Sequence, residues 1–210
     1  MKDRQQSRRE PGDVEGKARE GERAGRRVHQ SPSAAVPIMD AAAIQRALRR
    51  IAHEIIERNP DLKSIVLAGI PSRGVEIAHR VAEFIRAIDK IDIDTGVIDV
   101  AMHRDDVGTR ADLPMVYASK LPAPLEGRTV IIVDDVLFTG RTVRAAMDAI
   151  SSFGRPARIQ LAALIDRGHR ELPIRADYVG KNLPTAPTED VRVQLQQADG
   201  QPDGVWIDKP

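Results

Sequence analysis

The residues best suited to chemistry in this sequence follow a short aliphatic run near position 130. Four aliphatic residues, Val130–Val133, are followed directly by two carboxylates, Asp134 and Asp135. After three more apolar residues the chain continues with Thr139-Gly140-Arg141-Thr142. Carboxylates accept hydrogen bonds from a sugar diol, and they are also good partners for Mg²⁺. The run therefore indicates a site for a ligand that carries a diol, a metal-binding group or both.

The loop after these two acids has the features of a phosphate-binding turn. A loop that leads straight into a helix presents free backbone N–H groups and the positive end of the helix dipole, and both favour an anion. Gly140 lets the backbone approach a ligand closely, and Thr139 and Thr142 add hydroxyl donors. The sequence therefore predicts that a phosphate group binds at this loop.

Other readings of the same run find less support in the chain. An apolar strand that ends in two acids is also found in P-loop ATPases, but the sequence has no Gly-x-x-x-x-Gly-Lys-Ser/Thr motif. It also has no Gly-x-Gly-x-x-Gly after a strand, which weakens the case for a dinucleotide-binding fold. A plain strand with a charged turn does not account for the hydroxyls and the glycine that follow the acids in order.

Alternating strands and helices are expected to position these residues. A helix is predicted from its N-cap Asp40 to Asn59-Pro60, because its apolar residues recur at helical spacing. Further helices are predicted over Val75–Ile88 and Thr142–Phe153, and strands over Ser64–Ala68, Val97–Met102, Thr129–Val133 and Arg158–Ile165, with a long loop over Arg104–Leu113. This alternation predicts an α/β fold with a parallel central sheet flanked by helices, whose ligands lie at the carboxyl ends of the strands.

Composition limits the remaining possibilities. A chain of 210 residues suits one domain, and the absence of cysteine excludes disulfides and thiolate metal sites. No apolar run is long enough to cross a bilayer and no secretory signal is apparent, so we expect a cytoplasmic protein with no membrane partner. Residues 1–35 are expected to be a disordered N-terminal extension, and residues 36–210 to be the folded domain.

The run Val130–Thr142 resembles the motif with which type I phosphoribosyltransferases bind 5-phosphoribosyl-1-pyrophosphate (PRPP). Three segments, Ile51–Asn59, Asp134–Asp148 and Asp166–Asn182, resemble the bacterial PyrR family more closely still. The resemblance implies a type I phosphoribosyltransferase fold with a small hood at Arg167–Thr185. It also implies a uracil phosphoribosyltransferase that converts uracil and PRPP to UMP and pyrophosphate. Such a protein would also bind the mRNA leader of a pyrimidine operon and regulate transcription attenuation in response to UMP.

The resemblance implies a role for each of several PRPP-contacting residues. Asp134 and Asp135 would bind the ribose hydroxyls, and they are candidate ligands for the expected cofactor Mg²⁺. Ser72, Arg73 and Gly74 would bind pyrophosphate. Residues expected around the 5′-phosphate are Val136, Leu137, Phe138, Thr139, Gly140, Arg141 and Thr142, and those expected to begin a mobile catalytic loop are Arg104, Asp105 and Asp106.

Base and RNA recognition are also implied by the resemblance. Tyr178 would stack on uracil, the Val179 backbone would read the edge of the base, and Arg167 would contact the base or pyrophosphate. Taken alone, Tyr178 reads as a half-buried strand aromatic. The residues expected to contact RNA are Arg49, Arg50, His53, Arg170, Arg175 and Lys181. A homodimer or homotetramer is implied as well.

The chain departs from the family pattern mainly at the expected RNA surface. Arg49 replaces a usual threonine, and Ala186-Pro187 replaces Ser-Arg, which removes an arginine. His103 replaces a tyrosine before the expected catalytic loop, and that loop is shortened. The catalytic motif is intact while the expected RNA surface is altered, which favours the transferase interpretation over the regulator interpretation. Two alternatives stay open: an RNA-binding regulator with vestigial catalysis, and a transferase for a purine base.

Overall fold

The computed structural model describes residues 35–100 and 118–210. The expected N-terminal extension falls outside these residues except for Ala35, which begins a strand. The expected catalytic-loop residues Arg104, Asp105 and Asp106 also lie outside them.

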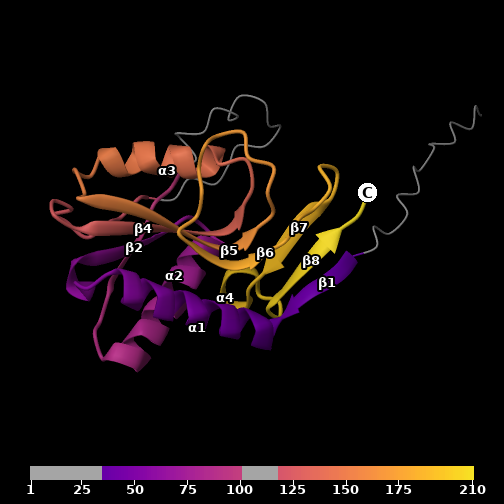
Figure 1. Ribbon diagram of the computed structural model, residues 1–210, viewed down its shortest axis with the longest axis horizontal. Coiled ribbons are helices and arrows are strands. Elements are labelled where there is room, and N and C mark those ends of the chain that lie inside the picture. Colours follow the sequence, from indigo (N-terminus) through magenta and orange to yellow (C-terminus); the bar gives the residue numbers. More distant parts are fainter. Residues whose placement is uncertain (1–34, 101–117) are drawn as a thin grey trace, which may run out of the picture. The chain divides into compact units, whose positions relative to one another are not determined.

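A five-stranded parallel sheet forms the centre of the fold, with the strand order β3-β2-β4-β5-β6 (Figure 1). Its strands are β2 (Ile65–Gly69), β3 (Asp94–Val97), β4 (Thr129–Leu137), β5 (Arg158–Asp166) and β6 (Tyr178–Asn182). The central strands are buried on both faces, which explains their continuous aliphatic sequences. The predicted α/β class with a parallel sheet is confirmed.

Helices cover both faces of this sheet. Helices α1 (Ala41–Arg58) and α2 (Arg73–Asp89) pack on one face against Ile131 and Val133 of β4. Helix α3 (Arg141–Ser151) packs on the other face against Val130 and Ile132, as Figure 1 shows. The side chains of β4 alternate between the two cores because successive residues of a strand point to opposite faces.

Helix α1 begins and ends where its sequence predicts. Asp40 is its N-cap, and its carboxylate accepts a hydrogen bond from the Ala43 N–H at 2.7 Å. Asn59 ends the helix, and its backbone N–H donates to the Ile55 carbonyl at 3.1 Å.

Two strand predictions need correction. The strand expected over Val97–Met102 is instead β3, which ends at Val97. Strand β4 continues past Val133 to Leu137, so Asp134 and Asp135 belong to the end of the strand and do not follow it. The continued pairing of β4 with β5 through Leu137 and Asp166 explains this extension.

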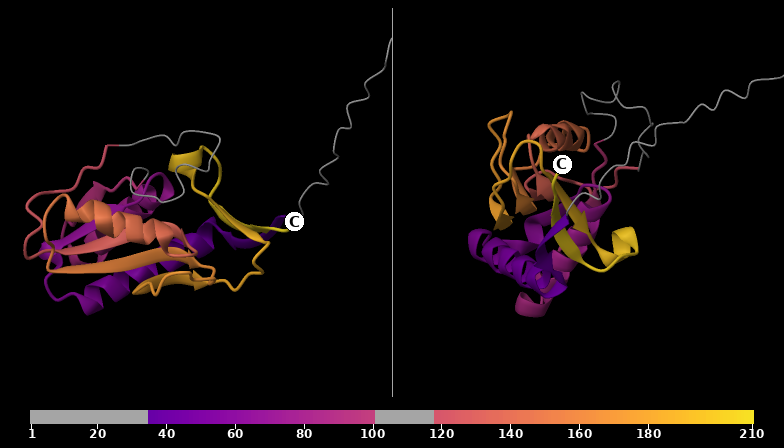
Figure 2. Two further views of the ribbon diagram at one scale, coloured as in Figure 1. Left: turned by 90° about the horizontal axis from the view of Figure 1, so that it is seen from above. Right: turned by 90° about the vertical axis from the view of Figure 1, so that its right-hand side faces the viewer.

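A second, antiparallel sheet was not predicted. It has the strand order β1-β8-β7 and comprises β1 (Ala35–Asp40), β7 (Asp190–Gln194) and β8 (Gly204–Asp208), with the short helix α4 (Gln196–Asp199) between the last two (Figure 2). The hood expected at Arg167–Thr185 is therefore misplaced, because β6 in that stretch belongs to the central sheet. The small separate sheet is built from β1 and from the residues after 189 instead.

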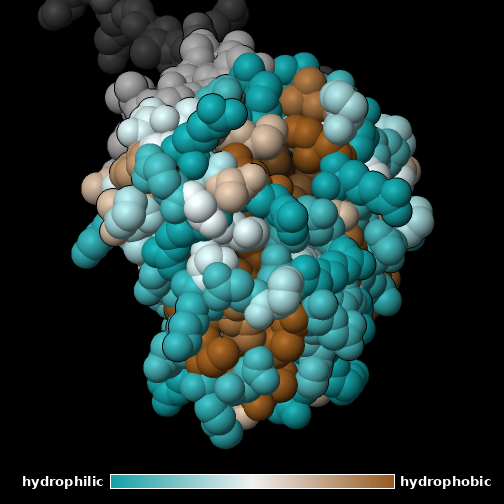
Figure 3. All heavy atoms as spheres, turned by 60° about the vertical axis from the view of Figure 1, so that its left-hand side comes forward, coloured by the Kyte–Doolittle hydropathy of each residue, from teal (hydrophilic) through white to brown (hydrophobic). Residues whose placement is uncertain are grey.

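Figure 3 shows one face on which hydrophilic residues predominate and hydrophobic residues gather in separate patches. Among the residues that the structure describes, no helix is long and apolar enough to cross a membrane.

Candidate active site at the carboxyl ends of the strands

The loop after β2 and the end of β4 meet because the two strands are neighbours in the sheet. The Ile70 N–H donates to the Val133 carbonyl at 3.0 Å. At Gly74, a Cβ atom would lie 2.3 Å from the same carbonyl oxygen, so only glycine fits there. Arg73 Nη1 lies 3.7 Å from Asp135 Oδ2. The residues expected to bind pyrophosphate and ribose are thus brought together.

The two acids of β4 lie in a largely desolvated environment. The side chain of Asp135 is 21% exposed, and Asp134 as a residue is 7% exposed. Burial raises the pKa of Asp135, while the positive charge of Arg73 and the hydrogen bond from the Val136 N–H oppose that rise. Arg73 therefore favours the charged form of a carboxylate that burial alone would tend to protonate.

Arg73 is also held by a residue that the sequence did not reveal. Its Nε and Nη2 atoms donate to the two carboxylate oxygens of Asp199 in α4 at 2.9 and 2.8 Å. This pairing raises the pKa of Arg73 and lowers the pKa of Asp199. The two residues are 126 positions apart, so no local pattern could have connected them.

The expected phosphate loop joins β4 to α3 through a left-handed glycine. Gly140 has φ +94°, a backbone conformation that residues other than glycine rarely adopt, and α3 starts at the next residue. The Arg144 N–H donates to the Gly140 carbonyl at 3.0 Å. The Arg141 side chain pairs with Glu171 at 2.6 Å. The loop is therefore compact and braced from outside by the segment that follows β5.

A pocket of about 320 Å³ lies beside this loop, between the segments that follow β5 and β6. Its lining residues are Asp166, Arg167, Gly168, His169, Asn182, Leu183, Pro184 and Thr185. Two aromatic contacts connect it to the phosphate loop. The Phe138 ring lies 4.2 Å from the Arg167 guanidinium carbon and 6.1 Å from the His169 ring. The pocket therefore adjoins the loop at which the sequence predicts a phosphate.

Arg167 lines this pocket but is only 4% exposed. Its guanidinium donates to the Thr185 hydroxyl at 3.2 Å, to Asp190 at 3.1 Å and to the Glu189 carbonyl. These contacts fix the segment that leads into β7. Arg167 thus stabilises the pocket wall, and its N–H groups are hydrogen-bonded to other residues of the protein.

The stacking role expected for Tyr178 does not fit the structure. Tyr178 is fully buried beneath α1, and its hydroxyl group accepts from Asn59 at 2.9 Å and donates to Gln160 at 3.1 Å. A ring at 0% exposure has no free face for a ligand. Val179 is partly exposed, but its carbonyl already accepts from Arg50 at 2.9 Å. Tyr178 is a core residue because its ring and its hydroxyl group are both satisfied within the fold.

Some of the residues expected to contact RNA are exposed, and others also contact protein groups. His53, Arg175 and Lys181 are exposed. Arg49, also exposed, lies over the Phe84 ring at 5.3 Å. Arg50 donates to the Val179 and Gly180 carbonyls at 2.9 and 2.7 Å.

The RNA contact expected for Arg170 does not fit its position. Its guanidinium makes five hydrogen bonds to backbone and side-chain oxygens around the phosphate loop. Because its donors are directed inward to the protein, they are not presented to a nucleic acid.

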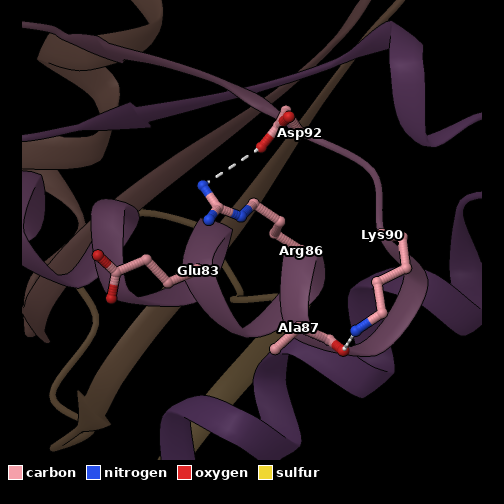
Figure 4. A pocket seen from close by; sticks show the side chains of 5 residues that line it. All are labelled: Glu83, Arg86, Ala87, Lys90 and Asp92. Atoms are coloured by element: carbon pink, nitrogen blue, oxygen red, sulfur yellow. Dashed lines mark hydrogen bonds and ion pairs between the residues drawn. The ribbon is translucent and has the colours of Figure 1, made fainter.

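A larger hollow, of about 590 Å³, lies at the far end of α2 from Arg73. Figure 4 shows its lining residues, Glu83, Arg86, Ala87, Lys90 and Asp92, of which Arg86 points toward Asp92 at 3.8 Å. The side chains of Arg86 and Asp92 are 71% and 87% exposed. This hollow has opposite charges on an open surface, so the smaller pocket at the strand ends is the better candidate site.

Comparisons with known proteins identify relatives of this chain. The phosphoribosyl transferase domain family matches residues 37–198. Curated relatives include the "Bifunctional protein PyrR" of Roseiflexus sp. (strain RS-1), 54% identical over 170 residues, 81% of this chain and 93% of that protein. The protein of the same name from Chloroflexus aurantiacus is 58% identical over 163 residues, 78% of this chain and 90% of that protein.

Solved structures with the same fold are more distant in sequence. A hypoxanthine phosphoribosyltransferase of Trypanosoma cruzi has a TM-score of 0.63 and 17% identity, and covers 83% of this chain and 97% of its own. A hypoxanthine-guanine phosphoribosyltransferase of Bacillus anthracis has a TM-score of 0.63 and 17% identity, and covers 81% of this chain and 96% of its own. These structures support the fold, and the closer relatives identify the family. The chain belongs to the PyrR family of the phosphoribosyltransferases.

Proposed function

We propose that this protein is a uracil phosphoribosyltransferase that also binds the mRNA leader of a pyrimidine operon and responds to UMP. One observation carries the enzymatic part. Arg73, the Asp134-Asp135 pair and the phosphate loop, which belong to two separate segments of the chain, converge at the carboxyl ends of β2 and β4. Ligands of open α/β sheets bind at such positions.

The reaction needs positioning more than covalent chemistry. The bond from the ribose C1 atom to pyrophosphate breaks, the bond from C1 to uracil N1 forms, and the N1 proton is released. Asp134 and Asp135 would hold the ribose hydroxyls, and Ser72, Arg73 and Gly74 would hold the departing pyrophosphate. Fixing the two reactants and stabilising the leaving charge can supply most of the rate increase.

Mg²⁺ would accompany PRPP. Proteins usually bind Mg²⁺ with one or two carboxylates together with phosphate oxygens, and Asp134 and Asp135 are donors of that kind. The ion would neutralise charge on pyrophosphate as it leaves.

Uracil is preferred to a purine on the strength of family membership and of the pocket beside Phe138. At about 320 Å³ the pocket has room for a small ring, and its polar wall includes the Thr185 carbonyl, whose oxygen lies 2.6 Å from Nε2 of His169. The regulatory part rests on the exposed basic residues Arg49, His53 and Lys181. We also expect a homodimer or homotetramer, as in the family.

The deciding experiment is an assay of UMP formation from PRPP and Mg²⁺ with uracil, run in parallel with hypoxanthine. We expect turnover with uracil alone. Replacing both acids, as D134N/D135N, should lower turnover by at least about a hundredfold, because the ribose loses its two charged hydrogen-bond acceptors. Exclusive turnover of hypoxanthine would favour the purine alternative. Absence of turnover with either base, together with RNA binding that responds to UMP, would favour a regulator with vestigial catalysis.

A further inference from the structure

Three successive carbonyls of the phosphate loop are hydrogen-bonded to one segment of the chain, residues 167–172, called the brace below. The Leu137 carbonyl accepts from the Arg167 N–H at 3.1 Å. The Thr139 carbonyl accepts from the N–H groups of Glu171 and Leu172 at 3.0 and 3.2 Å. The carbonyl between them, that of Phe138, accepts from a side chain, Arg170, at 2.7 Å.

Arg170 is the centre of this arrangement. Besides the Phe138 carbonyl, its guanidinium donates to the Leu137 carbonyl at 3.4 Å, to the Gly168 carbonyl at 3.0 Å and to the Ile174 carbonyl at 3.1 Å. It also forms an ion pair with Asp166 at 2.5 Å, which fixes the guanidinium against the end of β5. One side chain therefore ties the brace, β5 and the phosphate loop together.

These contacts determine which way the loop amides face. In a trans peptide the C=O of one residue and the N–H of the next point in opposite directions. Because the carbonyls of Leu137, Phe138 and Thr139 are directed to the brace, the N–H groups of the residues that follow each of them are directed away from it. Successive amides that face one side, ahead of a helix N-terminus, form a concavity that suits an anion.

We propose that Arg170 is a positioning residue for the 5′-phosphate, which keeps the loop carbonyls turned away from the anion and the loop amides turned toward it. This inference rests on the proposed function, because it assumes that the loop binds the phosphate of PRPP and UMP. An arginine is required because its fork of five N–H donors can serve several carbonyls at once, whereas a lysine has a single ammonium group.

The test compares ligands that carry a 5′-phosphate with one that does not. Kd values for UMP, ribose 5-phosphate and pyrophosphate are measured by calorimetry for the wild type, R170M and R170K. We expect R170M to bind UMP and ribose 5-phosphate at least about tenfold more weakly, the factor that corresponds to one lost charge-assisted hydrogen bond. The Kd for pyrophosphate should stay within about twofold of the wild-type value, because its expected site lies on the loop after β2. R170K should lie between the two.

A matched control is available in Arg155, an exposed arginine in the connection between α3 and β5. R155M should leave all three Kd values unchanged. R170K, which keeps the positive charge, carries the same comparison if R170M does not fold.

Three outcomes would contradict the inference. Unchanged UMP affinity in the folded variants would overturn the role of Arg170 alone. An equal loss for UMP and pyrophosphate would reduce Arg170 to a general structural residue. Absence of UMP binding in the wild type would overturn the proposed function and this inference with it.

Discussion

Tyr178 shows how a single residue can have the right type for one role and the environment for another. It is the largest fully buried side chain in the part of the chain that the structure describes, and its hydroxyl group lies between Asn59, which ends α1, and Gln160 of β5. Its ring thus joins α1 to the central sheet, and the polar end is satisfied by two buried amides. The family resemblance suggested that Tyr178 stacks on the base, but the burial of its ring decides against this role.

The Y178F variant separates the two roles of Tyr178. Removing the hydroxyl group takes a buried hydrogen-bond partner from both Asn59 and Gln160, which should lower the free energy of unfolding by about 1–3 kcal/mol. The KM for uracil should stay within about twofold, because the ring is retained and does not face the pocket. Urea denaturation and steady-state kinetics on the same preparation would test this. A large rise in KM with unchanged stability would restore the stacking role.

At the scale of elements, α1 has a buried stripe toward the sheet and a basic outer face. The outer face is not uniform. Arg50 reaches the edge strand β6 and donates to its Val179 and Gly180 carbonyls, while His53 one turn later is exposed. Replacing Arg50 therefore removes a structural contact, whereas replacing His53 does not.

Replacing these two residues separately should distinguish the RNA surface from the contact between α1 and β6. R50A should lower the free energy of unfolding by about 1 kcal/mol, whereas H53A should change it by less than about 0.5 kcal/mol. If α1 contacts RNA, H53A should weaken UMP-dependent binding of the operon leader by about tenfold with UMP formation unchanged. Filter binding, thermal unfolding and the uracil assay provide the three readouts. Wild-type RNA affinity in H53A would place the RNA surface elsewhere.

The elements that the sequence predicted are those with strong local patterns. Helix α1 has helical spacing with Asp40 and Asn59 at its ends, and the aliphatic runs of β2, β4 and β5 are long enough to identify. The second sheet has short strands of five or six residues, and its order β1-β8-β7 joins distant parts of the chain. Long-range pairing of that kind leaves no local signal.

The same distinction applies to the candidate site. The Asp134–Thr142 run is local and could be read directly, because each residue type has a chemical reason to be there. The contact of Arg73 with Asp199 and the contacts of Arg170 with the loop carbonyls span 126 and up to 33 positions, and an arginine in a loop is equally consistent with a solvent-exposed or ligand-binding role. Only the fold shows which protein groups accept hydrogen bonds from these two guanidinium groups.

Across the molecule, one ionic cluster connects helix α2 to the segment between β7 and β8. Arg80 of α2 pairs with Glu76 on its own helix and with Asp203, which precedes β8. Glu76, 4% exposed at its side chain, accepts from the Ala198 N–H of α4 at 2.8 Å. Since Arg73 at the start of α2 pairs with Asp199 of the same α4, the whole cluster fixes α4 beside the expected pyrophosphate loop.

Asp203 allows the energetic weight of this cluster to be measured. Its side chain is 9% exposed, and it accepts from Arg80 at 3.0 Å and from the Gln196 N–H at 2.9 Å. The hydrogen bond from Arg80 lowers the pKa of Asp203. A carboxylate whose pKa is lower in the folded state stabilises the fold above its unfolded value of about 3.9, and that contribution is lost as the pH falls through the folded value.

We therefore expect D203N to lower the free energy of unfolding by about 1–3 kcal/mol at pH 7, because Arg80 loses a charged partner in a mostly buried position. The difference from the wild type should begin to shrink as the pH falls below about 4, where the carboxylate of the unfolded chain takes up a proton, and it should be lost as the pH passes the lowered pKa of the folded state. D92N is the matched control: the Arg86–Asp92 pair is exposed and 3.8 Å apart, so its removal should cost less than about 1 kcal/mol. Urea denaturation across this pH range measures both variants. A D203N deficit no larger than that of D92N, or one that persists unchanged in acid, would show that the cluster does not hold α4 in place by charge.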